Sequence, residues 1–349
     1  MEKQSEEYLL ELLKTNSPSG YEMQASELFV NYLNKYCDVS TDVLYNSVAT
    51  INANADTKIL IDAHIDEIGL QITQINESGY LFFRRVGGVD AAVMPGTEVV
   101  VLGGKGEIAG IIGKKSVHLQ NFEEFKRPIT LNDLCIDIGV DSAKKAREMV
   151  SVGDYITIKP NAKFLNNDRI ISKALDNKIG VFVLSEVMKQ LSKENVTIGV
   201  YGVASSQEEV GSKGIKIQAN KIKPKYSICI DVCYSSDIYN SSDKGISNVS
   251  LGGGVGVVHS TDCNVEFISR VKESALENNI QFQSVVPISP TGCNNTASIQ
   301  LSSDGVVTCL LSVPCRYMHT PVEMCDINDV QSAIDLIKNI VLNIDKMYR

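Results

Sequence analysis

The feature that most constrains the fold is an interruption in the pattern of helices and strands. Short β-type runs follow one another from about residue 68 to residue 160, and glycine pairs such as Gly87-Gly88 and Gly103-Gly104 separate them. Evenly spaced short strands with glycine-rich turns are typical of a small barrel or sandwich. One helix is predicted inside this stretch, near residues 141–150. The chain alternates between helices and strands on either side, so we interpret the β-rich stretch as an insertion.

The flanking segments predict a single α/β domain that the insertion divides. We expect its parts at residues 1–66 and 164–349, with the inserted domain at residues 67–163. Apolar residues at helical spacing predict two helices in the first 40 residues, and the turn at residues 17–20 should cap the second. The other predicted elements are strands at 48–51, 58–64, 197–203, 226–231 and 306–313 and helices at 178–191 and 327–344, the last with Asp326 as its N-cap.

The composition argues against several classes of protein. The 349 residues include 33 Lys and Arg against 42 Asp and Glu, a formal net charge of −9. An acidic chain without basic runs has no electrostatic footprint for nucleic acid or an anionic membrane. No apolar stretch approaches the ~20 residues of a membrane-spanning helix, and the acidic start does not match a secretory signal. The nine scattered cysteines are typical of reduced thiols, so we expect a cytoplasmic protein.

Ligand-type side chains recur close to the ends of predicted strands and at the start of one helix. In chain order they are His64, Asp66, Asp176, Glu208, Glu209, Asp231 and His319. In open α/β sheets, ligands bind outside the carboxyl ends of the strands. Alternation along a strand also puts His64 and Asp66 on the same face, where a carboxylate can orient an imidazole. Two histidines and three carboxylates are enough for a dinuclear divalent metal site.

Each candidate also has a simpler interpretation. His64 could be a hydrogen-bonded histidine at a strand end, and the pair Glu208-Glu209 could form an exposed charged turn. Asp176 could be the N-cap of the helix that follows it, which is the commoner role for such a residue. The residues alone leave these alternatives open.

The ordered set of motifs resembles the glutamyl and tetrahedral aminopeptidases, a family of dinuclear metallopeptidases whose members are sometimes labelled endoglucanases. The resemblance covers essentially the whole chain. The motifs that carry it are His64-Ile-Asp66-Glu67-Ile-Gly69, Lys173-Ala-Leu-Asp176, Gln207-Glu208-Glu209-Val-Gly211, Asp231-Val232 and Arg316-Tyr-Met-His319-Thr-Pro-Val-Glu323.

The resemblance implies a zinc-peptidase-like αβα sandwich with an inserted small β-barrel. It implies that His64 and Asp231 bind one metal ion, that Glu209 and His319 bind the other, and that Asp176 bridges the two. Glu208 matches the general base, and Asp66 the acid behind His64. The resemblance also implies zinc or cobalt ions as cofactors and removal of N-terminal residues from short peptides. It further implies a homo-oligomer, a dodecamer built from dimers.

Three positions depart from the family pattern. Asn177 follows Asp176 where the family usually has a second aspartate, Asn295 replaces an aspartate, and a Gly252-Gly-Gly-Val255 loop replaces Gly-x-Gly-Pro. The segment Asn294-Asn295-Thr296 is expected near the substrate side of the site, so the preferred N-terminal residue stays open. The alternatives are another amide hydrolase on the same centre (a deacetylase or an acylamino-acid hydrolase), an endoglucanase, and a non-catalytic assembly subunit.

Overall fold

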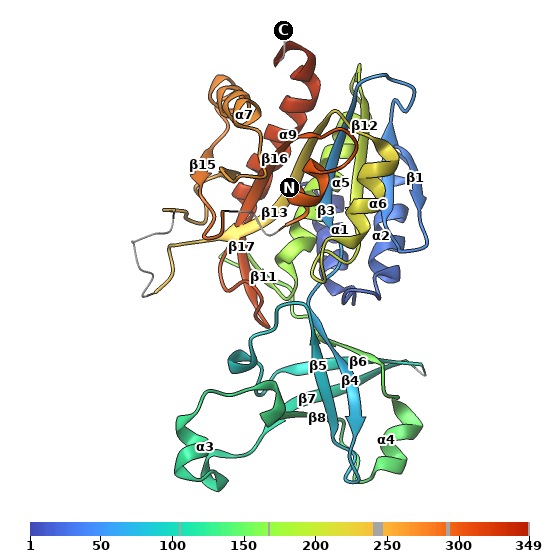
Figure 1. Ribbon diagram of the computed structural model, residues 1–349, viewed down its shortest axis with the longest axis vertical. Helices are drawn as coiled ribbons and strands as arrows, with labels where there is room; N and C mark the ends of the chain where they lie inside the picture. The colour runs from blue at the N-terminus through green and yellow to red at the C-terminus, as the bar shows by residue number, and fades with distance from the viewer. Residues whose placement is uncertain (105, 167, 240–246, 291–293, 348–349) are drawn as a thin grey trace.

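An eight-stranded mixed sheet forms the centre of the larger part of the molecule (Figure 1). The computed structural model describes residues 1–349 apart from 105, 167, 240–246, 291–293 and 348–349. The strands, in the order in which they pair, are β1 (Asp38–Thr41), β2 (Ser47–Ile51), β12 (Gly199–Ser205), β3 (Lys58–His64), β13 (Tyr226–Tyr234), β16 (Val307–Cys315), β14 (Val255–Val258) and β15 (Phe282–Val285). The four strands β12, β3, β13 and β16 run parallel, so their carboxyl ends meet at one edge.

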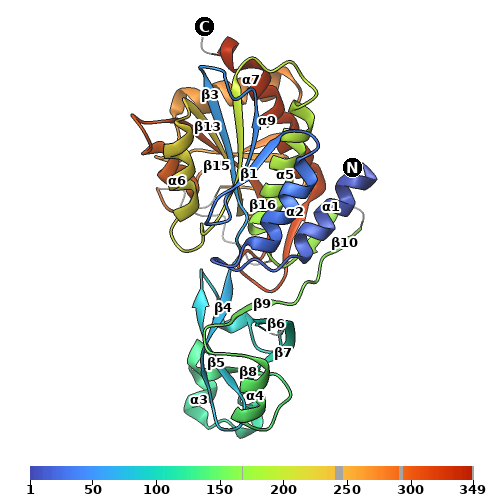
Figure 2. The ribbon, with the colours of Figure 1, turned by 90° about the vertical axis from the view of Figure 1, so that its right-hand side faces the viewer.

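Helices cover both faces of this sheet, as the second view shows (Figure 2). One face packs against α1 (Lys3–Lys14), α2 (Met23–Leu33), α5 (Leu175–Leu191), α7 (Val265–Glu277) and α9 (Ile327–Met347), and the other against α6 (Lys213–Ile222) and α8 (Asn295–Gln300). Successive side chains of β3 point to opposite faces of the sheet, so this strand contributes to a core on each face. Ile59 and Ile61 belong to the larger core, and Leu60 belongs to the smaller one beneath α6 and α8.

The β-rich stretch forms a closed six-stranded barrel below the sheet (Figure 1). Around the barrel the strands are β4 (Gly69–Ile75), β5 (Leu81–Val86), β8 (Leu134–Asp137), β7 (Gly106–Lys114), β6 (Glu98–Gly103) and β9 (Tyr155–Ile158). The helical pieces attached to it are η1 (Ala91–Val93), η2 (Val117–Leu119), α3 (Phe122–Lys126), η3 (Leu131–Asp133) and α4 (Ala143–Met149). Apolar side chains from alternate positions fill its interior, which forms a core of its own.

A small three-stranded sheet leads from the barrel back to the α/β part. It consists of β10 (Lys163–Leu165), β11 (Arg169–Ser172) and β17 (Glu323–Asp326). Because β11 pairs with β17, the segment just before α5 lies beside the segment just before α9.

A buried ionic cluster joins the barrel to the sheet. The Lys173 ammonium donates to both carboxylate oxygens of Glu67, at 2.7 and 2.8 Å, and to the Thr157 hydroxyl on β9. The Lys178 ammonium donates to Glu67 as well, at 3.1 Å, and to the backbone carbonyl of Thr15. Although burial opposes ionisation of Glu67, the two ammonium groups lower the pKa of its carboxyl. Burial lowers the pKa of Lys178 to about 7.

Most predicted elements are present, with a few differences. Helix α3 and the short helical turns of the barrel were not predicted, because they are only three to five residues long and lack a full helical repeat. The predicted cap at residues 17–20 is wrong: Glu22 precedes α2 without a capping side-chain bond, and Ser19 instead donates to Asp66. The carboxylate of Asp326 accepts the Asn328 N–H at 2.7 Å, as an N-cap does.

The barrel strands run from Gly69 to Ile158 and lie within the predicted insertion at residues 67–163. That these two parts are separate domains, with boundaries at 66/67 and 163/164, stays a prediction. No helix in the described ranges is long and apolar enough to cross a lipid bilayer.

Replacing Glu67 by glutamine should destabilise the chain strongly, because it leaves two buried ammonium groups without their carboxylate. We expect Glu67→Gln to lower the free energy of unfolding by about 3–5 kcal/mol, measured by urea denaturation. Asp141→Asn is the matched control, since Asp141 pairs with Lys145 on the exposed surface and its loss should leave the unfolding midpoint unchanged. Equal midpoints for Glu67→Gln and the control would contradict the structural role of the cluster.

Candidate active site

The register of the parallel strands brings four of the predicted residues to one edge of the sheet. His64 ends β3 and lies opposite Ser205, the last residue of β12, so Glu208 and Glu209 follow β12 at the same level. On the other side of β3, Cys229 of β13 lies opposite Asp62, which brings Asp231 level with His64. The pairing of the parallel strands is enough to produce this arrangement, because their carboxyl ends lie at the same edge of the sheet.

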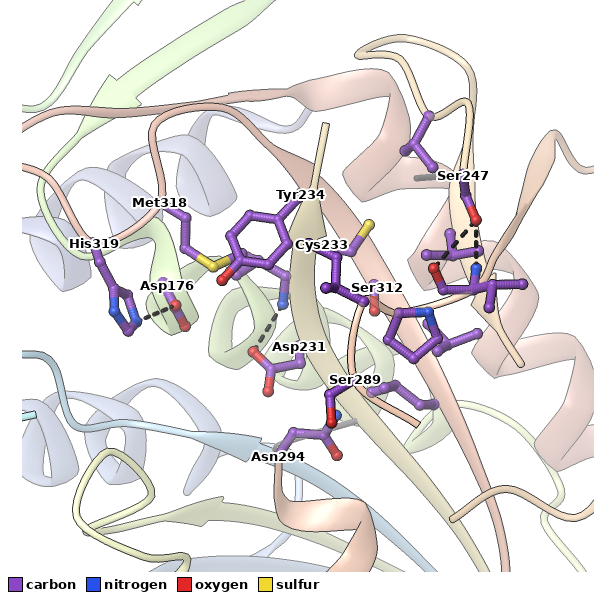
Figure 3. Close-up of a pocket in the computed structure, with 18 of the residues that line it drawn as sticks. Asp176, Asp231, Cys233, Tyr234, Ser247, Ser289, Asn294, Ser312, Met318 and His319 are labelled. Atoms are coloured by element: carbon purple, nitrogen blue, oxygen red, sulfur yellow. Dashed lines mark hydrogen bonds and ion pairs between the residues drawn. The ribbon is translucent and has the colours of Figure 1, made fainter. Parts of the chain in front are cut away.

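Asp176 reaches this edge from the start of α5. Its backbone is not helical (φ −77°, ψ 103°). The capping bond comes from its neighbour, because the Asn177 side-chain oxygen accepts the Gly180 N–H at 3.2 Å. The Oδ1 atom of Asp176 lies 3.2 Å from His64 Nε2 and its Oδ2 lies 3.2 Å from His319 Nε2. His319 comes from the loop between β16 and β17 (Figure 3). One carboxylate therefore contacts an imidazole on each side.

Two groups of donor atoms result, and they share Asp176. His64, Asp176 and Asp231 form a fully buried group, and Asp176, Glu209 and His319 form a second, partly buried one. Within each group the donor atoms lie within 4.8 Å of one another, and Glu209 Oε1 is 3.2 Å from His319 Nε2. Imidazole nitrogen and carboxylate oxygen are the ligands that zinc and similar divalent ions take in proteins. The donor set therefore fits two such ions.

Asp66 connects the histidine to the acidic loop. Its Oδ1 lies 3.4 Å from His64 Nδ1, and its backbone carbonyl lies 3.1 Å from the same nitrogen. The same carboxylate accepts the backbone N–H groups of Glu208 at 2.9 Å and Glu209 at 3.2 Å. It also accepts the Ser19 hydroxyl at 2.6 Å. The Asp66 side chain thus positions three of the predicted site residues at once.

Glu323 positions the backbone of two other donors in the same way, and it was not among the site residues predicted from the sequence. One of its oxygens accepts the Asp176 N–H at 2.9 Å, and the other accepts the His319 N–H at 2.8 Å. Its presence four residues after His319, in a buried strand, was the available signal. A carboxylate that holds the backbone of two donors fixes the directions of their side chains.

The barrel reaches the site through a glycine turn. A Cβ atom on Gly88 would lie 2.7 Å from His319 Nδ1, and one on Gly87 would lie 3.1 Å from Glu209 Oε2. Gly87 also has φ +80°, which favours glycine. The turn after β5 therefore packs directly against two of the three donors of the second group, Glu209 and His319.

The cluster holds more acidic side chains than basic ones, and this excess affects the pKa values of its members. Burial raises the pKa of Glu208 to about 9, that of Asp231 to about 7 and that of Glu323 to about 8. Burial opposes protonation of the two histidines, yet hydrogen bonds to carboxylates raise the pKa of His319 to about 11 and that of His64 as well. Added positive charge would let these carboxylates ionise, which also fits bound divalent ions.

The two asparagines that replace family aspartates make hydrogen bonds that a carboxylate could not donate. The Asn177 amide donates to the backbone carbonyl of Ile230 at 2.8 Å. The Asn295 amide donates to the buried carboxylate of Asp62 at 2.7 Å and to Ser205 at 2.9 Å. Asn294 of the same segment lines the cavity beside the site, whereas Asn295 is not among the described residues that line it.

A cavity of about 410 Å³ opens from the cluster, between the ends of β13, β14, β15 and β16 (Figure 3). His64, Glu208, Glu209, Asp231 and His319 form its base. The site therefore joins a candidate metal centre to a space that can hold a small molecule or a chain end.

Comparison with known proteins identifies the family of the chain. The family model for M42 glutamyl aminopeptidase matches residues 46–336. The chain belongs to the M42 glutamyl aminopeptidase family. It is a hydrolase of the aminopeptidase class, as the motif resemblance implied, and membership implies divalent metal ions as cofactors.

Several relatives resemble this M42 chain over nearly its whole length. The lysyl aminopeptidase of Pyrococcus furiosus is 30% identical, with 98% of each chain covered. The solved structure of a TET aminopeptidase from a marine sediment archaeon of the Thaumarchaeota has a TM-score of 0.93 at 28% identity, covering 97% of this chain and 96% of that one. The Pyrococcus horikoshii TET1 peptidase, described as assembling into a tetrahedron or a large octahedral shell, has a TM-score of 0.87 at 31% identity, covering 97% and 99%.

These structures confirm the predicted fold class, an αβα sandwich with an inserted small barrel. A Thermotoga maritima structure labelled endoglucanase also matches, with a TM-score of 0.78 at 26% identity and coverage of 97% and 98%. The mixed labels expected for the family are therefore present among the neighbours.

Restoring the family aspartate at Asn295 should destabilise this M42 chain in a pH-dependent way. Burial raises the pKa of Asp62 to about 6, and Asn295→Asp would put a second buried carboxylate against it. An acid whose pKa is raised by folding binds its proton more tightly in the folded chain than in the unfolded one. The stability it contributes therefore falls as the pH rises from about 4 through the folded pKa.

We expect Asn295→Asp to lower the free energy of unfolding by about 1–3 kcal/mol at pH 8, and by less at pH 5. Urea denaturation at the two pH values, in buffer with the same metal concentration, measures the difference. Asn220→Asp on the exposed surface of α6 adds the same charge and should behave like the parent at both. A loss that is equal at pH 5 and pH 8 would contradict this interpretation.

Proposed function

We propose that the protein is a dinuclear, metal-dependent aminopeptidase that removes the first residue from short peptides. The observation that carries the proposal is the pair of donor groups that share the Asp176 carboxylate. In this proposal His64 and Asp231 hold one ion, Glu209 and His319 hold the other, and Asp176 bridges them. Zn²⁺ or Co²⁺ suits these nitrogen and oxygen donors.

The chain's own residues would divide the remaining chemistry. Bound divalent ions would supply Lewis acidity and lower the pKa of a water molecule at the site. Glu208 would take the proton of that water and pass it to the leaving amine, as a general base and then a general acid. Its place in the lining of the cavity, together with the donor residues, supports this role. Asp66 would keep His64 and the Glu208 backbone in position, which its hydrogen bonds support.

Two variants separate these roles, with aminoacyl-p-nitroanilides as substrates. Glu208→Gln should keep both metal ions and lose about 10²–10⁴-fold in turnover, which is the usual contribution of general-base catalysis. Glu209→Gln should bind one ion more weakly. Metal content by elemental analysis and kcat on a panel of anilides measure both effects. Equal metal loss in the two variants would contradict the division of roles.

The same assay separates an aminopeptidase from its rivals. Chelated protein should be inactive, and Zn²⁺ or Co²⁺ should restore cleavage of anilides that have a free amino group. Faster cleavage of their N-acetyl forms would indicate an acylamino-acid hydrolase or deacetylase. Metal-independent hydrolysis of a β-glucan would indicate the endoglucanase, and no activity with full metal content would indicate a non-catalytic subunit.

The domain roles, assembly and location complete the proposal. Residues 1–66 and 164–349 would form the catalytic domain, and residues 67–163 would serve oligomerisation and access. We propose a cytoplasmic homo-oligomer of twelve subunits that is built from dimers. Exposed apolar side chains on the barrel support assembly: Leu119, Phe122 and Phe125 are 71%, 66% and 64% exposed. Apolar groups gathered on a surface mark interaction sites.

Charges introduced into this patch should weaken the assembly. We expect the double variant Phe122→Asp/Phe125→Asp to sediment as a smaller species than the parent at micromolar concentration, because aspartates cannot be buried against an apolar partner. Val43→Asp, at a position that is 93% exposed on the α/β part, is the control and should sediment like the parent. An unchanged oligomer in the double variant would remove the patch from the interface.

A further inference from the structure

The cavity extends away from the metal-ligand candidates along an apolar wall. Beyond Asp231 it is lined by side chains at the ends of four strands and in the loops that follow them. The apolar lining includes Val232, Val249, Val258, Val285, Leu310 and Met318. The close-up shows Met318 beside His319, and Ser289 and Asn294 on the side of Asp231 (Figure 3).

Among the residues that the structure describes, those with charged side chains lie at the base of the cavity. Among the described lining residues, every ionisable acid or histidine belongs to the donor cluster or is Glu208. The other polar lining groups are neutral, among them Ser247, Ser289, Asn294 and Ser312. Arg316 and Asp237, which are not among the described lining residues, form an ion pair with each other at 2.5 and 3.0 Å.

A charged side chain would be poorly placed in such a cavity. Burying an ammonium or carboxylate group without an opposite charge costs far more than burying an apolar group gains. A site that prefers a lysyl or glutamyl residue would need a carboxylate or a cation at the apolar wall. No such group lines that wall in the described part of the chain.

We propose that this cavity receives the side chain of the substrate's first residue and selects neutral, apolar ones of the size of leucine or methionine. The inference rests on the proposed aminopeptidase function, because the scissile carbonyl must then lie against the donor cluster and Glu208. The first side chain can extend from there along the apolar wall. The relatives named for lysyl and glutamyl substrates would differ from this chain in that wall.

The volume sets the expected order among neutral residues. About 410 Å³ is more than an alanyl methyl group can fill, so longer apolar side chains bury more surface. Each added methylene group should raise kcat/KM by about fourfold while it finds an apolar contact. The expected order is therefore glycyl, alanyl, valyl, then leucyl and methionyl.

The first test compares leucyl, methionyl, alanyl, lysyl and glutamyl p-nitroanilides on the metal-loaded protein. We expect kcat/KM for the leucyl substrate to exceed those for the lysyl and glutamyl substrates at least tenfold. A lysyl or glutamyl preference would overturn the inference and leave the aminopeptidase proposal intact. Failure of every anilide with full metal content would instead overturn the proposed function.

A binding measurement keeps the inference testable without turnover. Free L-leucine, L-lysine and L-glutamate, each titrated into metal-loaded protein by calorimetry, share the amino and carboxylate groups and differ only in side chain. We expect leucine to bind at least tenfold more tightly than the other two. Equal affinities, or tighter binding of lysine or glutamate, would overturn the inference whatever the activity.

A matched pair of variants tests whether the side chain enters this cavity. Val286 lines the cavity at its rim and is 60% exposed, so a polar replacement there should not disturb folding. Val286→Asp should raise the ratio of lysyl to leucyl kcat/KM at least threefold relative to Val286→Asn, which has the same shape without the charge. An identical ratio in the two variants would show that the first side chain lies elsewhere.

Discussion

The buried contact of Glu67 with Lys173 and Lys178 connects the parts on which the candidate site depends. Glu67 follows Asp66, Lys173 precedes Asp176 by three residues, and the same ammonium groups bind the end of α1 and strand β9. Two cations and one carboxylate out of water are stable only when their hydrogen bonds are complete. The segments bearing His64 and Asp176 and the barrel can therefore pack only in an arrangement that completes this cluster.

The positions of the candidate donors depend on carboxylates that would not themselves bind an ion. Asp66 holds the backbone of Glu208 and Glu209, and Glu323 holds the backbone of Asp176 and His319. Such contacts fix ligand directions before any ion or substrate arrives, which is the usual requirement for a precise metal site. They also explain why so many acids lie in one place: some offer oxygen atoms to the cavity, and others order the chain behind them.

The local pattern of apolar residues and turns predicted the α/β segments and the β-rich insertion. The resemblance to the aminopeptidase family then implied the barrel and the roles of the candidate residues. An apolar run that ends in ligand-type residues, such as residues 58–64, indicates both a buried strand and where that strand ends. The sequence could not predict that Asn295 faces Asp62, because that contact joins α8 to β3 across 233 positions. The role of Glu323 could not be predicted for the same reason, because its contact with Asp176 spans 147 positions. The apolar wall of the cavity combines residues from four separate strands and could be recognised only in the folded chain.

The absence of a side chain at Gly88 links the barrel mechanically to the far side of the site. Its backbone lies so close to the His319 ring that even a methyl group would not fit. A small rotation of the barrel relative to the sheet would therefore press on the imidazole or leave a gap beside it. A contact that fixes the orientation of the barrel and a ligand that fixes His319 are therefore thermodynamically coupled. Each raises the binding affinity of the other by the same factor.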